Sequence, residues 1–213
     1  MIIGIMGESG AGKTTSLRNL NPAETFYIDC DKKGLSWKGW RDGFSGEKKN
    51  YLKTDFPQVA LQALQKVNTD KAYKHIKVLV VDTINGIMVD DEMTRMNEKG
   101  YDKWVDLAVA VYGIINYALT MRDDITVVFV AHTQTERDDG GNTWTRVKTS
   151  GKKLDKLNVE SKLTTVLHAV ASNGRYIFRT RADSSTAKAP LGAFSEDEID
   201  NDITLVLKAL EDY

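Results

Sequence analysis

Short apolar runs alternate along the chain with longer segments in which apolar residues recur every three or four positions. The apolar runs predict buried strands at residues 1–6, 25–29, 77–82 and 125–131. The helical spacing predicts helices at residues 13–20, 57–67, 90–97 and 101–122. Strands and helices that alternate in this way predict an α/β fold, with a mainly parallel twisted sheet between two layers of helices.

The remaining segments are more polar and carry turn residues. Residues 32–55 are rich in Gly and Lys and predict irregular structure, and a polar, Gly-containing stretch covers residues 132–157. Residues 163–171 and 175–182 predict a late antiparallel strand pair that turns at Ser172-Asn173-Gly174.

Composition limits the class of protein. The chain has 213 residues and a net charge of −1, so a nucleic-acid surface would have to be a local patch. Its single cysteine, Cys30, excludes a disulfide framework and fits a reducing cytoplasm. The longest uncharged run, residues 107–121, is too short and too polar to cross a membrane. We expect a cytoplasmic protein of one domain, residues 1–213, with an acidic tail at 195–213 that ends in a short helix from about Asn201.

The most specific motif lies at the junction of the first predicted strand and helix, where residues 7–14 follow the pattern G-x-x-x-x-G-K-T. In that context the backbone N–H groups of such a loop surround the phosphates of a nucleoside triphosphate. Lys13 would reach the β- and γ-phosphates, and Thr14 would bring a hydroxyl group to Mg²⁺. The predicted phosphate contacts come from Gly7, Glu8, Ser9, Gly10, Ala11, Gly12, Lys13, Thr14 and Thr15.

Carboxylates end two of the predicted strands. Asp82 ends the strand at 77–82 and can hold a water on Mg²⁺, although capping of the next helix is an alternative. After the strand at 25–29, either Asp29 or Asp31 can orient the water for hydrolysis, and Asp31 is the favoured candidate. The alternative for these acids is a helix cap or a loop solvated by lysines. Cys30, between two acids, is not expected to act as a nucleophile.

Polar residues late in the chain can complete a nucleotide site. His132 follows the strand at 125–131 and can sense the γ-phosphate, with Gln134 as the substitute and a strand-capping histidine as the alternative. Arg179 and Arg181 alternate on a late strand and can reach the nucleotide of a neighbouring subunit, or else form a solvated strand edge. Lys188 is a weaker candidate for the same role.

Two segments have a composition suited to nucleic acid. Residues 32–53 hold seven basic and two acidic residues interleaved with aromatic ones, and Lys38 and Trp40 are the candidate contacts. The second segment, residues 143–156, contributes Arg146, Lys148, Lys152 and Lys153. For both segments, aromatic side chains in the core with lysines in water are an equally good interpretation.

In this order the motifs resemble those of the RecA-type ATPase core, a P-loop NTPase. GESGAGKTT (7–15) is similar to that family's GPESSGKTT, YIDCD (27–31) to FIDAE, and VLVVDT (78–83) to VIVVDS. The resemblance implies that Asp31 stands at the catalytic glutamate and His132 at the γ-phosphate-sensing glutamine. It likewise implies that Arg179 and Arg181 are similar to a subunit-bridging K-x-R finger, and that residues 139–142 fall at a DNA-binding loop.

More closely, the chain resembles small phage RecA-like single-strand annealing proteins, which are phage nucleotide-binding AAA proteins. The matching stretches are residues 28–40, 93–104, 130–134 and 186–194. The resemblance implies ATP and Mg²⁺ as cofactors and the cytoplasm of a bacterial host as the compartment. It implies single-stranded DNA, further copies of the chain in a ring or filament, and a single-strand-binding protein as partners. The shorter Asp31 in place of glutamate implies slow hydrolysis.

Three other interpretations stay open. A small-molecule or nucleotide kinase would need an acceptor pocket and an arginine-bearing lid. A helicase or DNA-packaging motor would displace strands at the expense of ATP. A nucleotide-gated DNA-binding module would have negligible turnover.

Overall fold

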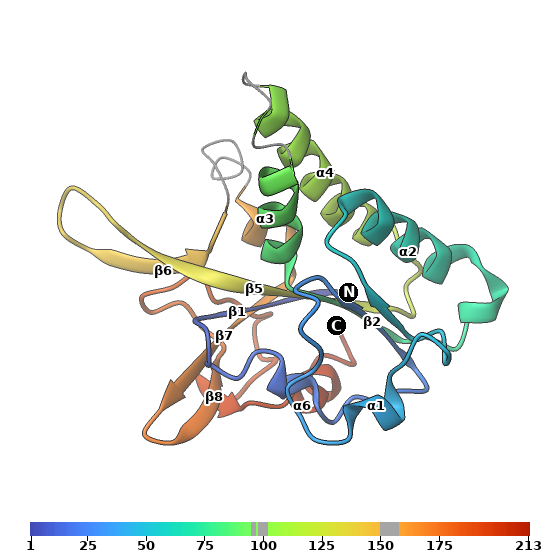
Figure 1. Cartoon of the computed structure of the whole chain (residues 1–213). Helices are drawn as coiled ribbons and strands as arrows, with labels where there is room; N and C mark the ends of the chain where they lie inside the picture. Colours follow the sequence, from blue (N-terminus) through green and yellow to red (C-terminus); the bar gives the residue numbers. More distant parts are fainter. Residues whose placement is uncertain (95–96, 98–101, 150–157) are drawn as a thin grey trace.

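The structure, a computed structural model, describes residues 1–94, 97, 102–149 and 158–213 and is built around one large sheet (Figure 1). Its strands are β1 (Ile2–Gly7), β2 (Thr25–Asp29), β3 (Tyr51–Lys53), β4 (Val78–Asp82), β5 (Thr126–Arg137), β6 (Thr143–Val147), β7 (Thr165–Ser172), β8 (Arg175–Arg179) and β9 (Glu198–Asp200). Their order is β3-β2-β4-β5-β1-β7-β8-β9, and β6 pairs with β5 outside this path. The predicted α/β architecture is confirmed.

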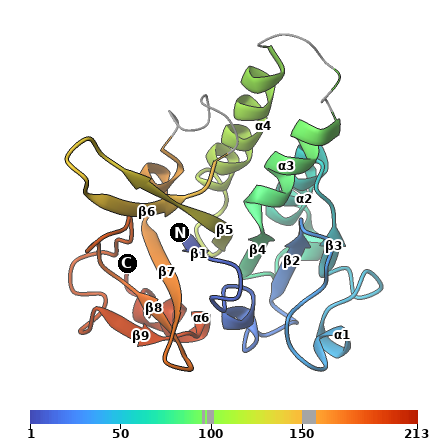
Figure 2. The ribbon, with the colours of Figure 1, turned by 60° about the vertical axis from the view of Figure 1, so that its left-hand side comes forward.

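Helices cover both faces of the sheet. One face carries α2 (Pro57–Thr69), α3 (Ile84–Thr94) and α4 (Asp102–Ala118), as Figures 1 and 2 show. The other carries the short α1 (Trp40–Gly43), the 3₁₀ turn η1 (Thr15–Leu17) and α6 (Ile203–Ala209). Two further 3₁₀ turns are η2 (Lys71–Tyr73) and η3 (Val159–Lys162).

The apolar runs predicted to be strands are buried on both faces of the sheet. In β4, Leu79 and Val81 pack under α2, α3 and α4, whereas Val78 and Val80 pack on the side of η1 and α6. Two buried faces explain why these strands are continuously apolar instead of alternating with polar residues.

Strand register brings the predicted site residues to one edge of the sheet. Strands β1, β2, β4 and β5 are parallel, so the carboxyl ends of β1, β2 and β4 lie together, beside His132 within β5. The register pairs Gly7 with His132 and Asp29 with Asp82. The phosphate loop and the candidate acids therefore meet at the same edge.

The helix predicted at residues 13–20 is the largest departure, since only the 3₁₀ turn η1 forms there. The hydroxyl of Ser16 donates a hydrogen bond to the Lys13 carbonyl at 2.6 Å and so competes with helical hydrogen bonding. Pro22 follows shortly after and disfavours helical conformation in the residue before it.

The polar stretch predicted at 132–157 contains regular structure, because β5 continues to Arg137 and pairs with β6 in a hairpin. Asp138 closes its turn by accepting a hydrogen bond from the Asn142 N–H at 2.8 Å. The segment at 32–55 likewise contains α1 and β3, and β9 precedes the predicted terminal helix. The late antiparallel pair is confirmed as β7 and β8. Parts of the predicted helices at 90–97 and 101–122 lie outside the described residues, and α3 begins six residues earlier than predicted, at Ile84.

Candidate functional site

The phosphate loop turns at two glycines, Gly10 and Gly12. Their φ angles of 81° and 86° are ones that glycine adopts more readily than residues with a Cβ atom. Lys13 is only 6% exposed and folds back into the loop. Its Nζ donates hydrogen bonds to the carbonyl oxygens of Gly7 and Glu8, both at 2.8 Å. Burial lowers the pKa of Lys13, and the charge of Asp82 opposes this effect. The loop thus holds the ammonium group at the point where a phosphate would replace the two carbonyls.

Asp82 is buried at the end of β4, beside the loop. The hydroxyl of Thr14 donates to its Oδ2 at 2.8 Å, and the hydroxyl of Tyr27 donates to the same oxygen. Its Oδ1 has no hydrogen-bond partner among the described residues. Burial raises the pKa of Asp82, although the hydrogen bonds from Tyr27 and Thr14 partly offset that rise.

An orphaned carboxylate oxygen next to a threonine hydroxyl fits Mg²⁺, which prefers oxygen ligands and keeps several of its waters. Thr14 would hold the ion directly and Asp82 would hold one of its waters. The two residues that the sequence predicts for the metal therefore lie side by side.

The two candidate acids after β2 have different surroundings. Asp29 is buried and accepts hydrogen bonds from the Gly34 N–H at 2.8 Å and the Tyr51 hydroxyl at 2.6 Å. These hydrogen bonds give Asp29 a structural role, because they hold the loop that follows β2 in place. Asp31 is half-buried and accepts hydrogen bonds from the Thr83 hydroxyl at 2.8 Å and from Lys33 at 2.5 Å. Of the two acids, Asp31 is the one that lines a cavity.

His132 lies directly against the phosphate loop. Its Nδ1 is 3.5 Å from Nζ of Lys13, and because a lysine ammonium can only donate, this contact favours the tautomer with the proton on Nε2. Burial, followed by the charge of Lys13, lowers the pKa of His132, which favours this neutral form. A neutral imidazole keeps one N–H donor, which is suited to a phosphate oxygen.

Asn85 and Thr133 hold the part of β5 beside the phosphate loop in place. Asn85 accepts a hydrogen bond from the His132 N–H at 2.7 Å and donates one to the Lys148 carbonyl at 2.8 Å. Thr133 donates its hydroxyl to Glu8 in the loop at 2.7 Å. The loop, β5 and β6 are therefore joined by direct hydrogen bonds.

A cavity of about 370 Å³ opens beside these groups. Asp31, Asn85 and His132 line it together with Cys30, Asp55, Gly86, Val89 and Met93. Burial raises the pKa of the Cys30 thiol well above its usual range, with the charge of Asp82 as the next cause. A raised pKa leaves little of the reactive thiolate at neutral pH.

The remaining candidates for the nucleotide site contact other residues of their own chain. Arg179 is paired with Glu198 at 3.2 Å and Arg181 with Asp197 at 3.0 Å, so both face the β9 segment of their own chain. Gln134 donates to Glu136 at 2.8 Å within the hairpin. Lys188 is half-buried, and its backbone pairs with that of Val166 in an isolated antiparallel bridge.

The candidate DNA contacts differ in exposure. Lys38 and Lys148 are exposed, whereas Arg146 is half-buried and paired with Glu136 at 3.3 Å. Trp40 is half-buried, with its ring 5.1 Å from that of Tyr51. Lys152 and Lys153 lie outside the described residues.

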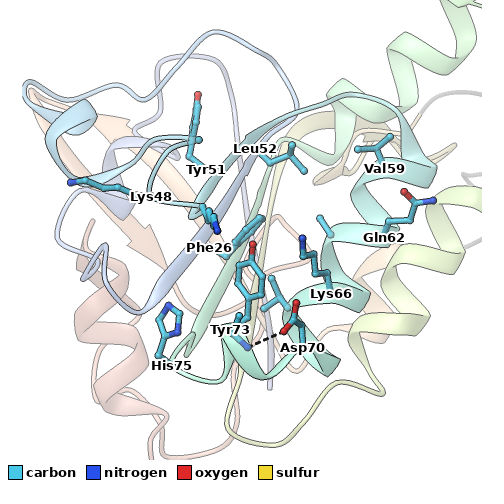
Figure 3. A pocket seen from close by; sticks show the side chains of 15 residues that line it. Phe26, Lys48, Tyr51, Leu52, Val59, Gln62, Lys66, Asp70, Tyr73 and His75 are labelled. Atoms are coloured by element: carbon cyan, nitrogen blue, oxygen red, sulfur yellow. Dashed lines mark hydrogen bonds between the residues drawn. The ribbon is translucent and has the colours of Figure 1, made fainter.

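Another cavity, of about 670 Å³, lies at the opposite edge of the sheet, where the parallel strands begin (Figure 3). It is bounded by Phe26 of β2, by Lys66 of α2 and by Tyr73, whose N–H donates to the Asp70 carbonyl at 3.0 Å. Lys48 and Tyr51 bring the basic and aromatic segment at 32–53 to its rim. None of the residues that line it belongs to the phosphate loop.

Sequence reasoning missed Tyr27, Thr133 and Asn85 as parts of the site. Tyr27 and Asn85 are within a few residues of the strand-end acids Asp29 and Asp82, and this proximity is the feature of the sequence that could have indicated them. Their hydrogen bonds, however, join residues 55 and 47 positions apart along the chain.

Comparison with known protein families agrees with this geometry. Residues 1–191 match the family described as AAA domain. No curated protein matches the chain. In the described part of the chain, no helix has the length and apolar character needed to span a bilayer. The phosphate loop, the strand-end Asp82 and the match over most of the chain agree, and the chain belongs to the AAA-domain family of P-loop NTPases.

Proposed function

We propose that this protein is an ATP- and Mg²⁺-dependent recombination protein that binds single-stranded DNA, anneals complementary strands and hydrolyses ATP slowly as an oligomeric switch. Its membership of the AAA-domain family supports the nucleotide-binding ATPase part of this proposal. The observation that carries the DNA part is the direct link from Lys13, through His132, to the β5–β6 hairpin and Lys148.

The nucleotide chemistry follows from the residues around the loop. Lys13 and the loop N–H groups hold the phosphates, while Thr14 and Asp82 hold Mg²⁺. When bound, Mg²⁺ neutralises charge on the β- and γ-phosphate oxygens. Asp31 orients the attacking water and accepts its proton. Its short side chain, already engaged by Thr83 and Lys33, would make turnover slow.

The link to DNA runs through backbone hydrogen bonds. The Lys148 N–H donates to the His132 carbonyl at 2.8 Å, and Asn85 ties both residues together. A γ-phosphate that takes the His132 Nε2–H as a donor would fix the imidazole, and its loss would release it. The hairpin would then alternate between ordered and relaxed arrangements, a segment-ordering switch.

Assembly would use the arginine pair. Arg181 and Asp197 form a surface ion pair whose side chains are 58% and 69% exposed. Exposed pairs of this kind contribute about 0–1 kcal/mol, so exchange of Asp197 for the γ-phosphate of a neighbouring subunit would cost little. Arg179, paired with Glu198, would take a supporting position.

The deciding experiment measures annealing of complementary strands and release of phosphate from ATP, with and without single-stranded DNA. Wild type, Lys13→Ala and Asp31→Asn are compared. We expect DNA to change the ATPase rate of wild type, Lys13→Ala to lose ATP-dependent annealing, and Asp31→Asn to bind ATP with turnover lower by about 10²-fold or more. A wild-type protein that neither binds single strands nor speeds their pairing would refute the proposal.

A small-molecule kinase is the second candidate, because the cavity beside Asp31 and His132 has room for an acceptor. The same assay separates the two functions. Transfer of the γ-phosphate to an added acceptor, with no effect of DNA on phosphate release, would favour the kinase.

A further inference from the structure

A third cavity, of about 320 Å³, borders the phosphate loop on the side of η1, and the proposed chemistry does not use it. It is lined by Thr15, Arg18, Tyr176, Asp200, Asn201, Asp202 and Leu205. Its volume is at the lower end of the roughly 300–1,000 Å³ that small-molecule sites occupy. Because Thr15 ends the phosphate loop, the cavity directly adjoins the predicted phosphate site.

The amide of Asn201 is the unusual group in this cavity. Asn201 is only 4% exposed, yet neither its Oδ1 nor its Nδ2 has a hydrogen-bond partner among the described residues. A buried amide without partners costs free energy, so such groups are normally satisfied in folded proteins. Here the amide lies against the phosphate loop, since a Cβ placed on Gly12 would be 3.2 Å from its Oδ1.

Tyr176 supplies the second wall. A Cβ placed on Gly12 would be 2.8 Å from Cδ1 of the Tyr176 ring, so the ring lies directly on the loop. Tyr176 is 53% exposed, which leaves much of its aromatic surface open. Aromatic faces of this kind stack on nucleobases.

Hydrogen bonds to η1 fix this wall in position. Arg18 Nη1 donates to the Asn201 carbonyl at 2.8 Å and to the Thr15 carbonyl at 3.1 Å. Asn19 donates to Asp202 at 2.6 Å, and the other oxygen of Asp202 accepts from the Thr204 N–H at 3.0 Å at the start of α6. The backbone on both sides of the amide is therefore held.

We propose that Asn201 and Tyr176 form the base subsite of the nucleotide site, and that the Asn201 amide selects adenine. An amide offers one acceptor and a donor side by side, which match N6 and N7 of adenine. Guanine presents two acceptors, O6 and N7, on the same edge and satisfies only the amide donor. The inference rests on the nucleotide-binding part of the proposed function and is independent of DNA.

The test measures dissociation constants of ATP, GTP and inorganic tripolyphosphate by calorimetry, without DNA. Wild type should bind ATP more tightly than GTP. Asn201→Leu should weaken ATP binding about tenfold, remove the preference over GTP and leave tripolyphosphate binding unchanged. Tyr176→Ala should weaken both nucleotides, and Tyr176→Phe, which keeps the ring, should match wild type.

Thermal unfolding of the nucleotide-free protein supplies an independent readout. Asn201→Leu removes two unsatisfied polar atoms, so its Tm should equal or exceed that of wild type; a purely structural amide would give a lower Tm. The inference is overturned if wild type binds ATP and GTP equally or binds neither. It is also overturned if Asn201→Leu and Tyr176→Ala weaken tripolyphosphate as much as ATP. Failure of annealing alone would overturn the proposed function and leave the base subsite standing.

Discussion

At the scale of single residues, the site holds charges that the fold alone does not favour. Asp82 is buried with one oxygen unpartnered, and burial raises its pKa, so the native state favours the protonated form. This contribution to stability is present at low pH and is lost as the pH rises through the native pKa. The ionised form needed for Mg²⁺ is therefore maintained at the expense of stability.

The corresponding prediction concerns Asp82→Asn. Removing the buried charge should raise the free energy of unfolding of the nucleotide-free protein at neutral pH by roughly 0.5–2 kcal/mol. The same variant should lose the extra stabilisation that Mg²⁺ adds to that of ATP. Denaturant titrations with and without Mg·ATP measure both effects, and Thr14→Ser, which keeps the hydroxyl, is the control. A destabilised Asp82→Asn, or one that still responds to Mg²⁺, would contradict this account.

The lowered pKa of His132 predicts that the stability of the protein depends on pH. Burial and the charge of Lys13 lower this pKa, so protonation is more favourable in the unfolded chain. The resulting stability is fully present above the usual histidine pKa and is lost as the pH falls through the lowered native value. Unfolding free energies measured between about pH 7.5 and pH 5.5 should fall less steeply for His132→Gln than for wild type.

The control for that measurement is His168→Gln. His168 also has a lowered pKa, from burial and then the charge of Arg179, but the charge of Lys13 is not one of the causes. Its replacement should reduce the slope without changing ATP binding. Equal slopes for wild type and His132→Gln would remove the argument that His132 is held neutral by the loop.

At the scale of elements, the β5–β6 hairpin is tied to the nucleotide site through Asn85. Removal of its amide leaves the His132 N–H and the Lys148 carbonyl without this partner. Asn85→Ala should therefore cost about 1–3 kcal/mol of stability and reduce the ratio of ATPase rates with and without single-stranded DNA towards one. Thr143→Ala, at an exposed position of the same hairpin, is the matched control. A stable Asn85→Ala that keeps full DNA stimulation would show that the coupling takes another route.

At this scale the buried strands could be predicted from the sequence, whereas one helix and one strand could not. Four buried strands and the edge where they end were predictable, because continuous apolar runs have few alternatives in an α/β chain. The prediction of a helix at 13–20 was wrong, because the apolar periodicity carries no information on the hydrogen bond from the Ser16 hydroxyl to the Lys13 carbonyl. Strand β6 was missed because its residues are mostly half-exposed, although its threonines favour strands.

At the scale of the whole molecule, the sheet order joins residues that are distant in sequence. The candidate base subsite brings Gly12 against Tyr176 and Asn201, and no local pattern could have revealed it. That the phosphate loop, Asp31 and Asp82 lie at one edge was predictable, because they end or follow the parallel strands β1, β2 and β4. Contacts between that edge and the carboxyl-terminal segment required the structure.

The charge of the whole molecule predicts how DNA binding should respond to salt. A net charge of −1 gives no general attraction to DNA, so affinity must come from exposed lysines such as Lys38 and Lys148. For single strands, the slope of log affinity against log salt is about −0.7 for each phosphate neutralised. Lys38→Ala and Lys148→Ala should each make the slope shallower by about that amount, whereas Lys77→Ala, whose side chain is paired with Asp124, should not. Fluorescence titrations over a range of salt concentrations measure the slope. If neither variant changes it, DNA binds to another face, and the proposed link through the hairpin fails.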